Sequence, residues 1–171
     1  MHHETVYIGI GSNLGEPVPQ AKQAIRDIAK IRQSELILTS SLYSSAALET
    51  GDQEEVQQDY INAIVGLKTS LTPFELLIEL QSIEQAHYRI RDPDNKWGPR
   101  TMDLDIILFG NKHIHDSHLT IPHLEMQNRL FVLQPLMEIT GEIYLPGLGS
   151  LQYLIQQAPK MQIQKFDSKV L

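Results

Sequence analysis

The sequence predicts an α+β fold in which two helices cover one face of an antiparallel sheet. Short runs of β-forming residues and two amphipathic segments follow one another in the order β-α-β-β-α-β. The length of 171 residues suits one domain, residues 1–171, which can bury about 70% of the surface that the unfolded chain exposes. No internal repeat, linker or low-complexity segment divides the chain. These three observations together favour one α+β domain.

The first half of the pattern occupies the N-terminal quarter of the chain. Residues 5–10 form a short strand that enters a turn at residues 11–15. After Pro17, apolar residues recur with the spacing of one helix face, which predicts a helix to about Arg32. Residues 36–43 are rich in β-forming residues and predict the second strand.

The second half of the pattern follows a long polar segment. Residues 44–59 lack an apolar period and predict a long, mobile loop. Residues 60–67 then form the third strand. The tetrapeptide from Thr72 to Glu75 has the spacing of a capping box, with proline at the first helical position, and starts a helix that ends near Tyr88.

The fourth strand completes the split βαβ pattern of ferredoxin-like folds. A second exposed loop, at residues 88–99, precedes this strand, which we place at 102–109. The remaining residues predict an irregular C-terminal extension, with a hairpin at 111–116, a helix near 129–139 and a short final helix and strand. The face of the sheet opposite the two helices is predicted to be open.

The composition excludes several classes of protein. There is no cysteine, so disulfides and thiolate metal sites are excluded and a reducing compartment, the cytoplasm, is expected. The apolar runs are shorter than the ~18 residues of a membrane span, and the N-terminus lacks the pattern of a signal peptide. A net charge of -7 argues against a broad nucleic-acid-binding surface. An anionic substrate would therefore need a local cluster of positive charge or metal ions.

Alternation along the third strand places two polar side chains on the open face of the sheet. The apolar residues at positions 61, 63, 65 and 67 form one continuous face. Tyr60 and Asn62 therefore project to the other face. Two interpretations remain for this pair: a ligand site, or the polar side chains that any sheet open to water carries.

Two carboxylates project from the fourth strand to the same open face. Asp103 and Asp105 do so because Leu104, Ile106 and Leu108 are predicted to face the helices. Aspartate is depleted in strands, and two like charges about 7 Å apart repel unless a cation lies between them. Carboxylates without histidine or thiolate suit a hard ion such as Mg²⁺, which adds water and substrate phosphates to its octahedron. The alternative is again a solvated polar face.

Positive charge gathers beside this strand. Arg89, Arg91, Lys96 and Arg100 fall within twelve residues of a chain that is acidic overall. Such residues often coat a solvated loop. Next to paired acids they favour a clamp for a polyphosphate, because guanidinium groups bind phosphate oxygens two at a time. Together with the carboxylates they indicate metal-assisted phosphoryl transfer.

Two other motifs do not carry this chemistry. GIGSNLG has leucine at position 14, where a G-x-G-x-x-G dinucleotide loop needs glycine, and no P-loop sequence occurs in the chain. The histidines of HIHDSH, at positions 113, 115 and 118, have a spacing that could hold a transition metal. A polar hairpin tip is the favoured interpretation of that segment.

Five motifs follow one another through most of the chain. They are YIGIGSNLG at 7–15, YINAIV at 60–65, RIR at 89–91, WGPRTMDLDIILFG at 97–110 and LTIPHLEMQNRLFVLQPL at 119–136. In this order they closely resemble the 6-hydroxymethyl-7,8-dihydropterin pyrophosphokinase family of the folate pathway. The resemblance implies a ferredoxin-like scaffold that uses two Mg²⁺ ions. It also implies transfer of a pyrophosphoryl group from ATP to the pterin hydroxymethyl group, giving AMP and the pterin diphosphate.

The same resemblance implies roles for individual residues. Asp103 and Asp105 would hold both metal ions, with Asp103 close to the attacking hydroxyl group, while Arg89 and Arg100 would act on the reacting phosphate. The implied nucleotide contacts are Gln81, Glu84, Arg91, Lys96, Trp97, Ile106, Thr120, His123 and Arg129. The implied pterin contacts are Tyr60 and Phe131, which would stack on the ring, Asn62, which would bind its edge, and Ser45 and Leu48.

The chain departs from the family pattern near both ligands. Ala46 and Ala47 stand where prolines are common, so the loop that contains them is expected to be more flexible. Leu124 and His118 replace a frequent aromatic residue and a frequent basic residue. These changes bear on ligand affinity rather than on the reaction.

The expected partners are two small molecules, ATP and the pterin, with no nucleic acid and no membrane, and the protein is expected to be a monomer. Two rival functions remain: a metal-dependent nucleotide phosphohydrolase, and a non-catalytic ligand-sensing domain, since ferredoxin-like folds serve many functions. Tyr60, Asn62 and Phe131 argue for an aromatic acceptor rather than water. The arginines and aspartates argue for chemistry rather than sensing.

Overall fold

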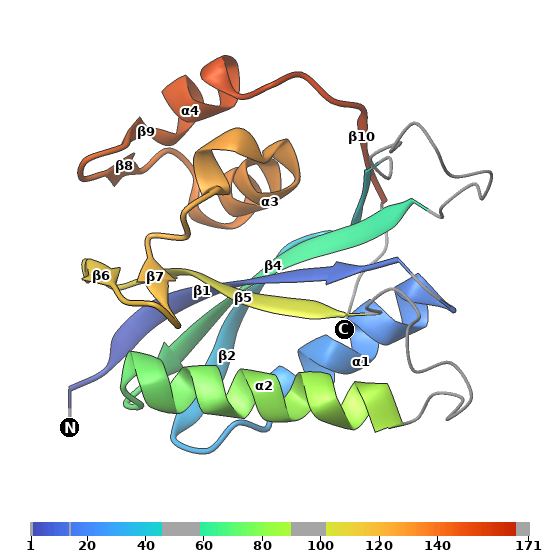
Figure 1. Ribbon diagram of the computed structural model, residues 1–171. Coiled ribbons are helices and arrows are strands. Elements are labelled where there is room, and N and C mark those ends of the chain that lie inside the picture. The colour runs from blue at the N-terminus through green and yellow to red at the C-terminus, as the bar shows by residue number, and fades with distance from the viewer. Residues whose placement is uncertain (1, 14, 46–58, 90–101, 167–171) are drawn as a thin grey trace.

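One antiparallel sheet forms the centre of the protein. The computed structural model describes residues 2–13, 15–45, 59–89 and 102–166 (Figure 1). The predicted loops at 44–59 and 88–99 fall largely outside these residues. The strands run in the order β10-β3-β4-β1-β5, and β2 also pairs with β4. Their bounds are β1 (Glu4–Ser12), β2 (Ser34–Thr39), β3 (Tyr43–Ser45), β4 (Tyr60–Thr69), β5 (Asp103–Phe109) and β10 (Ile163–Lys165).

Helices α1 (Pro17–Ile28) and α2 (Pro73–Arg89) lie together on one face of this sheet, as predicted (Figure 1). Between them and the sheet lies the first core, which takes side chains from both helices and from β1, β4 and β5. Its members include the predicted inward residues Ile61, Ala63, Val65 and Leu67. The element order and the strand order confirm the ferredoxin-like fold.

Helix α1 is shorter than its periodicity predicts. It ends at Ile28 rather than near Arg32. The amides of Lys30 and Ile31 bind carbonyls three residues back, at 3.1 Å each, so the chain tightens immediately after the helix. The backbone then turns into β2 through Gln33, which has a φ of 55°.

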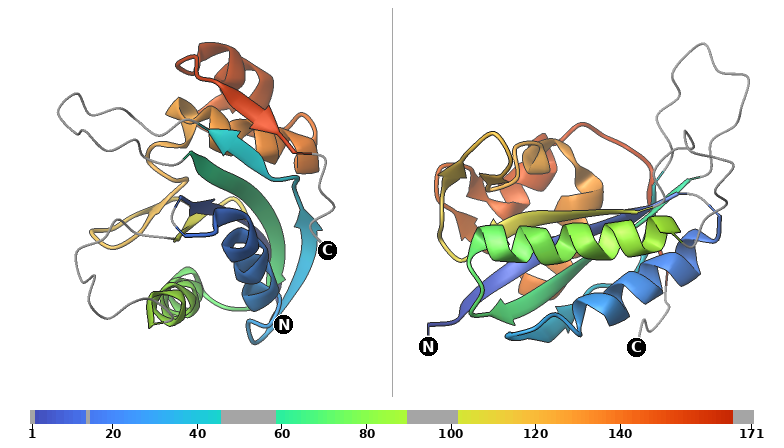
Figure 2. Two further views of the ribbon diagram at one scale, coloured as in Figure 1. Left: turned by 90° about the vertical axis from the view of Figure 1, so that its right-hand side faces the viewer. Right: turned by 60° about the horizontal axis from the view of Figure 1, so that its bottom comes forward.

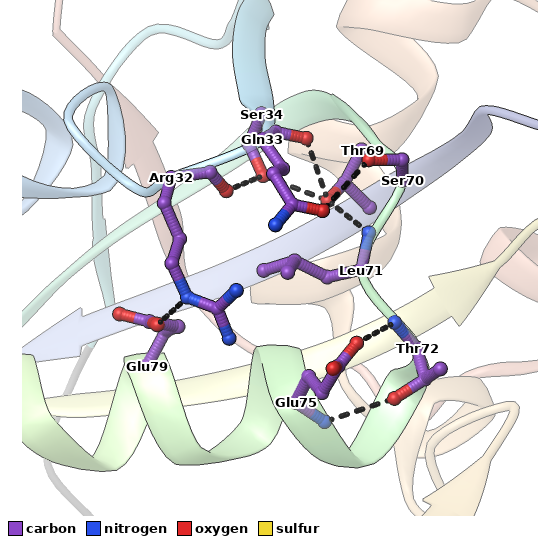
Figure 3. A network of polar contacts seen from close by, with 9 residues as sticks. All are labelled: Arg32, Gln33, Ser34, Thr69, Ser70, Leu71, Thr72, Glu75 and Glu79. Atoms are coloured by element: carbon purple, nitrogen blue, oxygen red, sulfur yellow. Dashed lines mark hydrogen bonds and ion pairs between the residues drawn. The ribbon is translucent and has the colours of Figure 1, made fainter. Parts of the chain in front are cut away.

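The predicted capping box starts helix α2 (Figure 3). The amide of Thr72 donates to the carboxylate of Glu75 at 2.8 Å, and the amide of Glu75 donates to the Thr72 hydroxyl at 3.2 Å. These hydrogen bonds lower the pKa of Glu75. One turn further along α2, Glu79 accepts a hydrogen bond from Arg32 at 2.8 Å. The cap and this ion pair fix the start of α2 against the end of α1.

The predicted second strand, residues 36–43, is in fact two strands. β2 ends at Thr39, and β3 begins at Tyr43. Between them, the Ser40 hydroxyl accepts a hydrogen bond from the amide of Ile64 at 2.9 Å, in the place of a backbone carbonyl. The Ser40 side chain thus provides an acceptor for a backbone amide of β4 where the chain bends. The bend brings β3 alongside the first residues of β4.

The second face of the sheet is largely covered, which contradicts the prediction of an open face. Helix α3 (Leu130–Thr140) lies over it, and α4 (Leu151–Gln157) packs against α3 (Figures 1 and 2). A second core fills the space between, with Ile64, Ile107 and Leu108 from the sheet and Leu133 and Leu136 from α3. Apolar residues on both faces of β4 and β5 therefore each have a partner layer, and among the described residues one end of the second face borders a cleft instead.

Strand β5 changes face within its apolar run, so the predicted orientation of Leu108 is wrong. Leu104 and Ile106 belong to the first core as expected, but Leu108 belongs to the second. The register between β1 and β5 shifts at this point, since Tyr7 pairs with Leu108 and Ile8 with Ile106. The extra residue in β5 is a β-bulge, which turns the following side chains over.

Short elements complete the C-terminal extension. They are the strand pairs β6 (Ile114–His115) with β7 (Thr120–Ile121) and β8 (Tyr144–Leu145) with β9 (Gly149–Ser150), and the 3-10 helix η1 (Met126–Asn128). The histidines at 113, 115 and 118 are exposed on and beside the β6–β7 hairpin. No helix in the described part of the chain has the length and apolar character needed to cross a membrane.

Candidate active site

A cleft of about 560 Å³ lies where α3 leaves the second face of the sheet uncovered. β5 supplies Asp103 and Asp105, β4 supplies Tyr60 and Asn62, and α3 supplies Phe131. Ser45 of β3 and Arg129, just before α3, also line it. The structure therefore brings seven of the predicted site residues, from four separate parts of the chain, to one cavity.

Strand pairing explains how the acids and the polar residues of β4 come to share this face. Gly11 of β1 lies between Asp103 on one side and Asn62 on the other, and Gly9 lies between Asp105 and Ile64. Side chains at paired positions point to the same face of a sheet. The two acids therefore face Asn62 and Ile64 across a central strand that carries no side chain there.

Gly9 and Gly11 form the floor of the cleft, although the sequence analysis named neither glycine as a site residue. A Cβ atom on Gly9 would lie 3.2 Å from the Ile107 side chain, whereas one on Gly11 would meet only the amide oxygen of Asn62, at 3.6 Å. Packing thus restricts position 9, but space is kept free at position 11. Glycine inside a strand is a known sign of close approach by a ligand or another backbone.

Asn62 is held by its neighbour on β3. Its amide nitrogen donates to the Ser45 hydroxyl at 2.8 Å, and both residues are buried. The amide oxygen points toward the space above Gly11. This orientation offers an acceptor at the floor of the cleft to a ligand that carries N–H groups.

His123 adds a neutral donor beside the acids. Burial lowers its pKa, and the nearby charge of Arg129 lowers it further against the opposing effects of Asp105 and Glu125. The ring accepts a hydrogen bond from the Glu125 amide through Nδ1 at 3.2 Å, so the proton of the neutral ring lies on Nε2. The backbone amide of His123 also donates to the carbonyl of Ile107 at 2.9 Å, which holds this segment along the edge of β5.

Arg129 and Phe131 act together at the start of α3. The guanidinium carbon of Arg129 lies 5.7 Å from the centroid of the Phe131 ring, within the range of a cation–π contact. This contact orients the ring at the edge of the cleft and keeps a positive charge beside it.

Several predicted nucleotide contacts lie outside the cleft. Gln81 and Glu84 are on α2 and Thr120 is on β7. Ile106 is buried in the first core, on the face opposite Asp105, because side chains alternate along β5. Only the backbone of Ile106 is therefore available to contact a nucleotide. The roles of the other three stay predictions.

The remaining predicted residues cannot be placed. Leu48, Arg91, Lys96, Trp97 and Arg100 lie outside the described residues, as do Ala46 and Ala47. Arg89 is the last residue of α2, which puts the start of the basic segment at the end of that helix, although its side chain is not described.

The sequence reasoning missed the wall that the C-terminal extension builds. Pro159, Lys160 and Met161, which follow α4, line the cleft, and so do Glu125 and Asn128 beside η1. Pro159, Lys160 and Met161 lie just before β10, which pairs with β3, and this distant contact leaves no pattern in the local sequence.

The donors at the acid pair fit a magnesium ion better than a transition metal. Asp103 and Asp105 provide oxygen atoms alone, and no group of three or more His, Cys, Asp or Glu side chains comes together elsewhere in the described ranges. Mg²⁺ commonly takes one or two carboxylates and fills its remaining positions with water and phosphate oxygens. The two carboxylates in an accessible cleft match that donor set.

Comparison with known proteins identifies the family. The family model for 7,8-dihydro-6-hydroxymethylpterin-pyrophosphokinase matches residues 7–141. The 2-amino-4-hydroxy-6-hydroxymethyldihydropteridine pyrophosphokinase of Haemophilus influenzae is 44% identical over 153 residues, covering 90% of this chain and 92% of that protein. The protein of the same name from Pseudomonas aeruginosa is 38% identical over 162 residues, covering 95% and 96%.

Solved structures support the fold. The wild-type HPPK-DHPS protein of Plasmodium falciparum matches with a TM-score of 0.67 and 15% sequence identity, over 91% of this chain and 44% of that one. An HPPK-DHPS structure in complex with substrates gives 0.71 and 13%, over 91% and 43%. The present chain thus corresponds to less than half of those proteins. With the sequence matches and the composition of the cleft, we conclude that the chain belongs to the 7,8-dihydro-6-hydroxymethylpterin-pyrophosphokinase family.

Proposed function

We propose that the protein transfers the pyrophosphoryl group of ATP to the hydroxymethyl group of 6-hydroxymethyl-7,8-dihydropterin, in keeping with its membership of the pyrophosphokinase family. The observation that carries this proposal is the meeting of Asp103 and Asp105 with Tyr60, Asn62 and Phe131 in one cleft. The acids suit a metal-bound triphosphate, and the aromatic and amide groups suit a flat heterocycle. The products are AMP and the pterin diphosphate.

The acid end of the cleft is proposed to bind the triphosphate. Asp103 and Asp105 would hold two Mg²⁺ ions, which when bound neutralise phosphate charge and polarise the β-phosphate. The hydroxyl oxygen of the pterin attacks the β-phosphorus and releases its proton. The bond from that phosphorus to the oxygen bridging to the α-phosphate breaks, and AMP leaves with that oxygen. Arg129 lines the cleft, and neutral His123 lies near Asp105, so both can donate to phosphate or ribose oxygens. Arg89 and Arg100 are proposed to bind the reacting group.

The opposite end of the cleft is proposed to bind the pterin. Tyr60 and Phe131 would stack on its two faces, while the Asn62 amide oxygen accepts from its ring N–H groups. Ser45 fixes the orientation of Asn62 through their 2.8 Å hydrogen bond. Positioning of the two substrates then supplies much of the rate, since the chemistry needs little more than alignment and charge neutralisation.

One assay separates this function from its rivals. The protein is incubated with ATP and Mg²⁺, with and without the hydroxymethyl dihydropterin, and the nucleotide products are identified. AMP that forms only when the pterin is present supports the proposal. ADP or phosphate without pterin would support a phosphohydrolase, and no turnover would support a sensing domain.

Phe131→Ala should weaken pterin binding at least tenfold and leave ATP binding nearly unchanged. The reason is that an aromatic stack contributes ~0.5–1.5 kcal/mol in addition to the burial of apolar surface. The truncated side chain loses both the stacking interaction and the buried area. Calorimetric titration with each ligand measures the effect. Tyr153→Ala, which removes an exposed ring on α4, is the control. Equal losses for both ligands would mean that Phe131 does not contact the pterin.

Gly11→Val should block the pterin without destabilising the fold. Its side chain would project into the space above Gly11, where the nearest atom is the Asn62 amide oxygen, 3.6 Å from the new Cβ. We expect pterin affinity to fall by more than about tenfold, while the melting temperature holds or rises, since valine favours strands over glycine.

Gly9→Ala provides the contrast for this variant. Its Cβ would lie 3.2 Å from Ile107, so it should lower the melting temperature. If Gly11→Val binds the pterin like the unaltered protein, the floor of the cleft is not part of the pterin site.

A further inference from the structure

The carboxylate of Glu138, in α3, joins three other segments of the chain. It accepts hydrogen bonds from the backbone amide of Ser41 at 2.9 Å and from the Ser41 hydroxyl at 2.8 Å. It accepts another from the Tyr43 hydroxyl at 2.9 Å, and Lys165 of β10 lies 3.5 Å away. One side chain thus ties α3 to the bend after β2, to β3 and to the last strand, a set of contacts that we name the Glu138 clasp.

The clasp joins the two walls of the proposed pterin site. Phe131 and Glu138 are seven residues apart in α3, so they lie on the same side of the helix. Phe131 forms one wall of the cleft. On the other side, Ser45 of β3 pairs with Tyr60 and accepts the hydrogen bond from Asn62. The clasp therefore connects α3, which carries Phe131, to β3, which pairs with the strand that carries Tyr60.

Apolar packing and the clasp both connect α3 to the sheet. In the second core, Val132 and Ile64 are buried where they line the cleft, whereas Met161 and Ile163 are only partly buried. Dispersion contacts are non-directional, whereas the hydrogen bonds to a carboxylate set both distance and direction. Figure 2 shows α3, β3 and β10 side by side at this edge of the molecule.

The electrostatics of the clasp favour a permanent contact. Burial acts to raise the pKa of Glu138, but the hydrogen bonds from Ser41 and Tyr43 and the charge of Lys165 outweigh it, so the pKa lies below its usual range. Burial and the same carboxylate raise the pKa of the Tyr43 hydroxyl. At neutral pH the acceptor is ionised and the donor keeps its proton, so the hydrogen bond is charge-assisted.

We propose that Glu138 is a positioning residue for the pterin: the clasp sets the width of the slot between Phe131 and Tyr60 without touching the substrate. This inference rests on the proposed function. It predicts that the affinity for the pterin depends on a residue at the far end of α3. The acid pair should be unaffected, because β5 is not part of the clasp.

Kinetics of Glu138→Ala test the inference. We expect the KM for the pterin to rise about tenfold, while the KM for ATP changes less than twofold and kcat less than threefold. Tyr43→Phe removes one hydrogen bond of the clasp and should raise the pterin KM about threefold at an unchanged melting temperature. The control is Glu79→Ala. It breaks the ion pair between Glu79 of α2 and Arg32, and it should change neither KM (Figure 3).

Each outcome decides the question. A merely structural role would raise both KM values together or lower the melting temperature without a selective effect on the pterin, and either result overturns the inference. If Glu138→Ala fails to fold, Tyr43→Phe decides alone, and an unchanged pterin KM in that variant overturns it. If the unaltered protein forms no AMP from ATP and the pterin, the proposed function itself fails and the inference fails with it.

Discussion

Asp105→Ala is expected to reduce turnover roughly a thousandfold while the fold and pterin binding persist. The side chain faces the cleft rather than either core, so its removal leaves no cavity. It also relieves the repulsion between Asp105 and Asp103 in the metal-free protein. One carboxylate cannot hold both proposed metal ions, and the triphosphate would then lie against the sheet without charge neutralisation.

The measurements for Asp105→Ala are melting temperature, pterin affinity and AMP formation with saturating Mg²⁺, all on the same preparation. Glu35→Ala removes an exposed carboxylate from β2 and should leave turnover unchanged. Near-normal AMP formation by Asp105→Ala would rule out the metal assignment. Loss of folding would show that Asp105 is a structural residue of the sheet.

Phe109→Ala, on the same strand, is expected to lower the stability of the fold while leaving the acid pair intact. Phe109 is 1% exposed in the first core, and truncation of a buried phenylalanine typically costs about 3–5 kcal/mol through lost burial and the remaining cavity. For a chain of this size that corresponds to a fall of roughly 10 °C in melting temperature. The acid pair lies at the other end of β5, so folded molecules should retain their KM for ATP.

Urea unfolding of Phe109→Ala measures the loss directly. Phe74→Ala is the matched control, because that ring is 44% exposed on α2 and should contribute less than about 1 kcal/mol. A similar free energy of unfolding for both variants would show that Phe109 does not anchor the first core.

Local patterns were sufficient to predict that four polar side chains of β4 and β5 share one face of the sheet. The alternation around Tyr60 and Asn62, and around Asp103 and Asp105, depends only on neighbouring residues, and the structure places all four in the cleft. The capping box at Thr72 is equally local, and its two hydrogen bonds are confirmed.

The errors arose where contacts are distant in sequence or leave no polar marker. The bulge in β5 falls in a run of apolar residues. Leu108 would be apolar on either face of the sheet, so the sequence does not reveal that it turns to the other face. Likewise, the apolar side chains of Ile64 and Ile107 belong to a face that was predicted to be open, and only α3 explains them. The Glu138 clasp joins residues 97 positions apart, for which a single sequence carries no signal.

The place of β1 in the middle of the sheet has a consequence for how the chain folds as it is made. β1 is made before its partners β4 and β5, and Val6 pairs with Phe109 about 100 residues later. At ~5–20 residues per second, translation takes roughly 5–20 s to supply that last partner. During this interval the apolar side chains of β1 lack a finished sheet. Closure of the first core therefore waits for β5, the strand that also carries the two aspartates, while the second core and the cleft also need α3 and the segment after it.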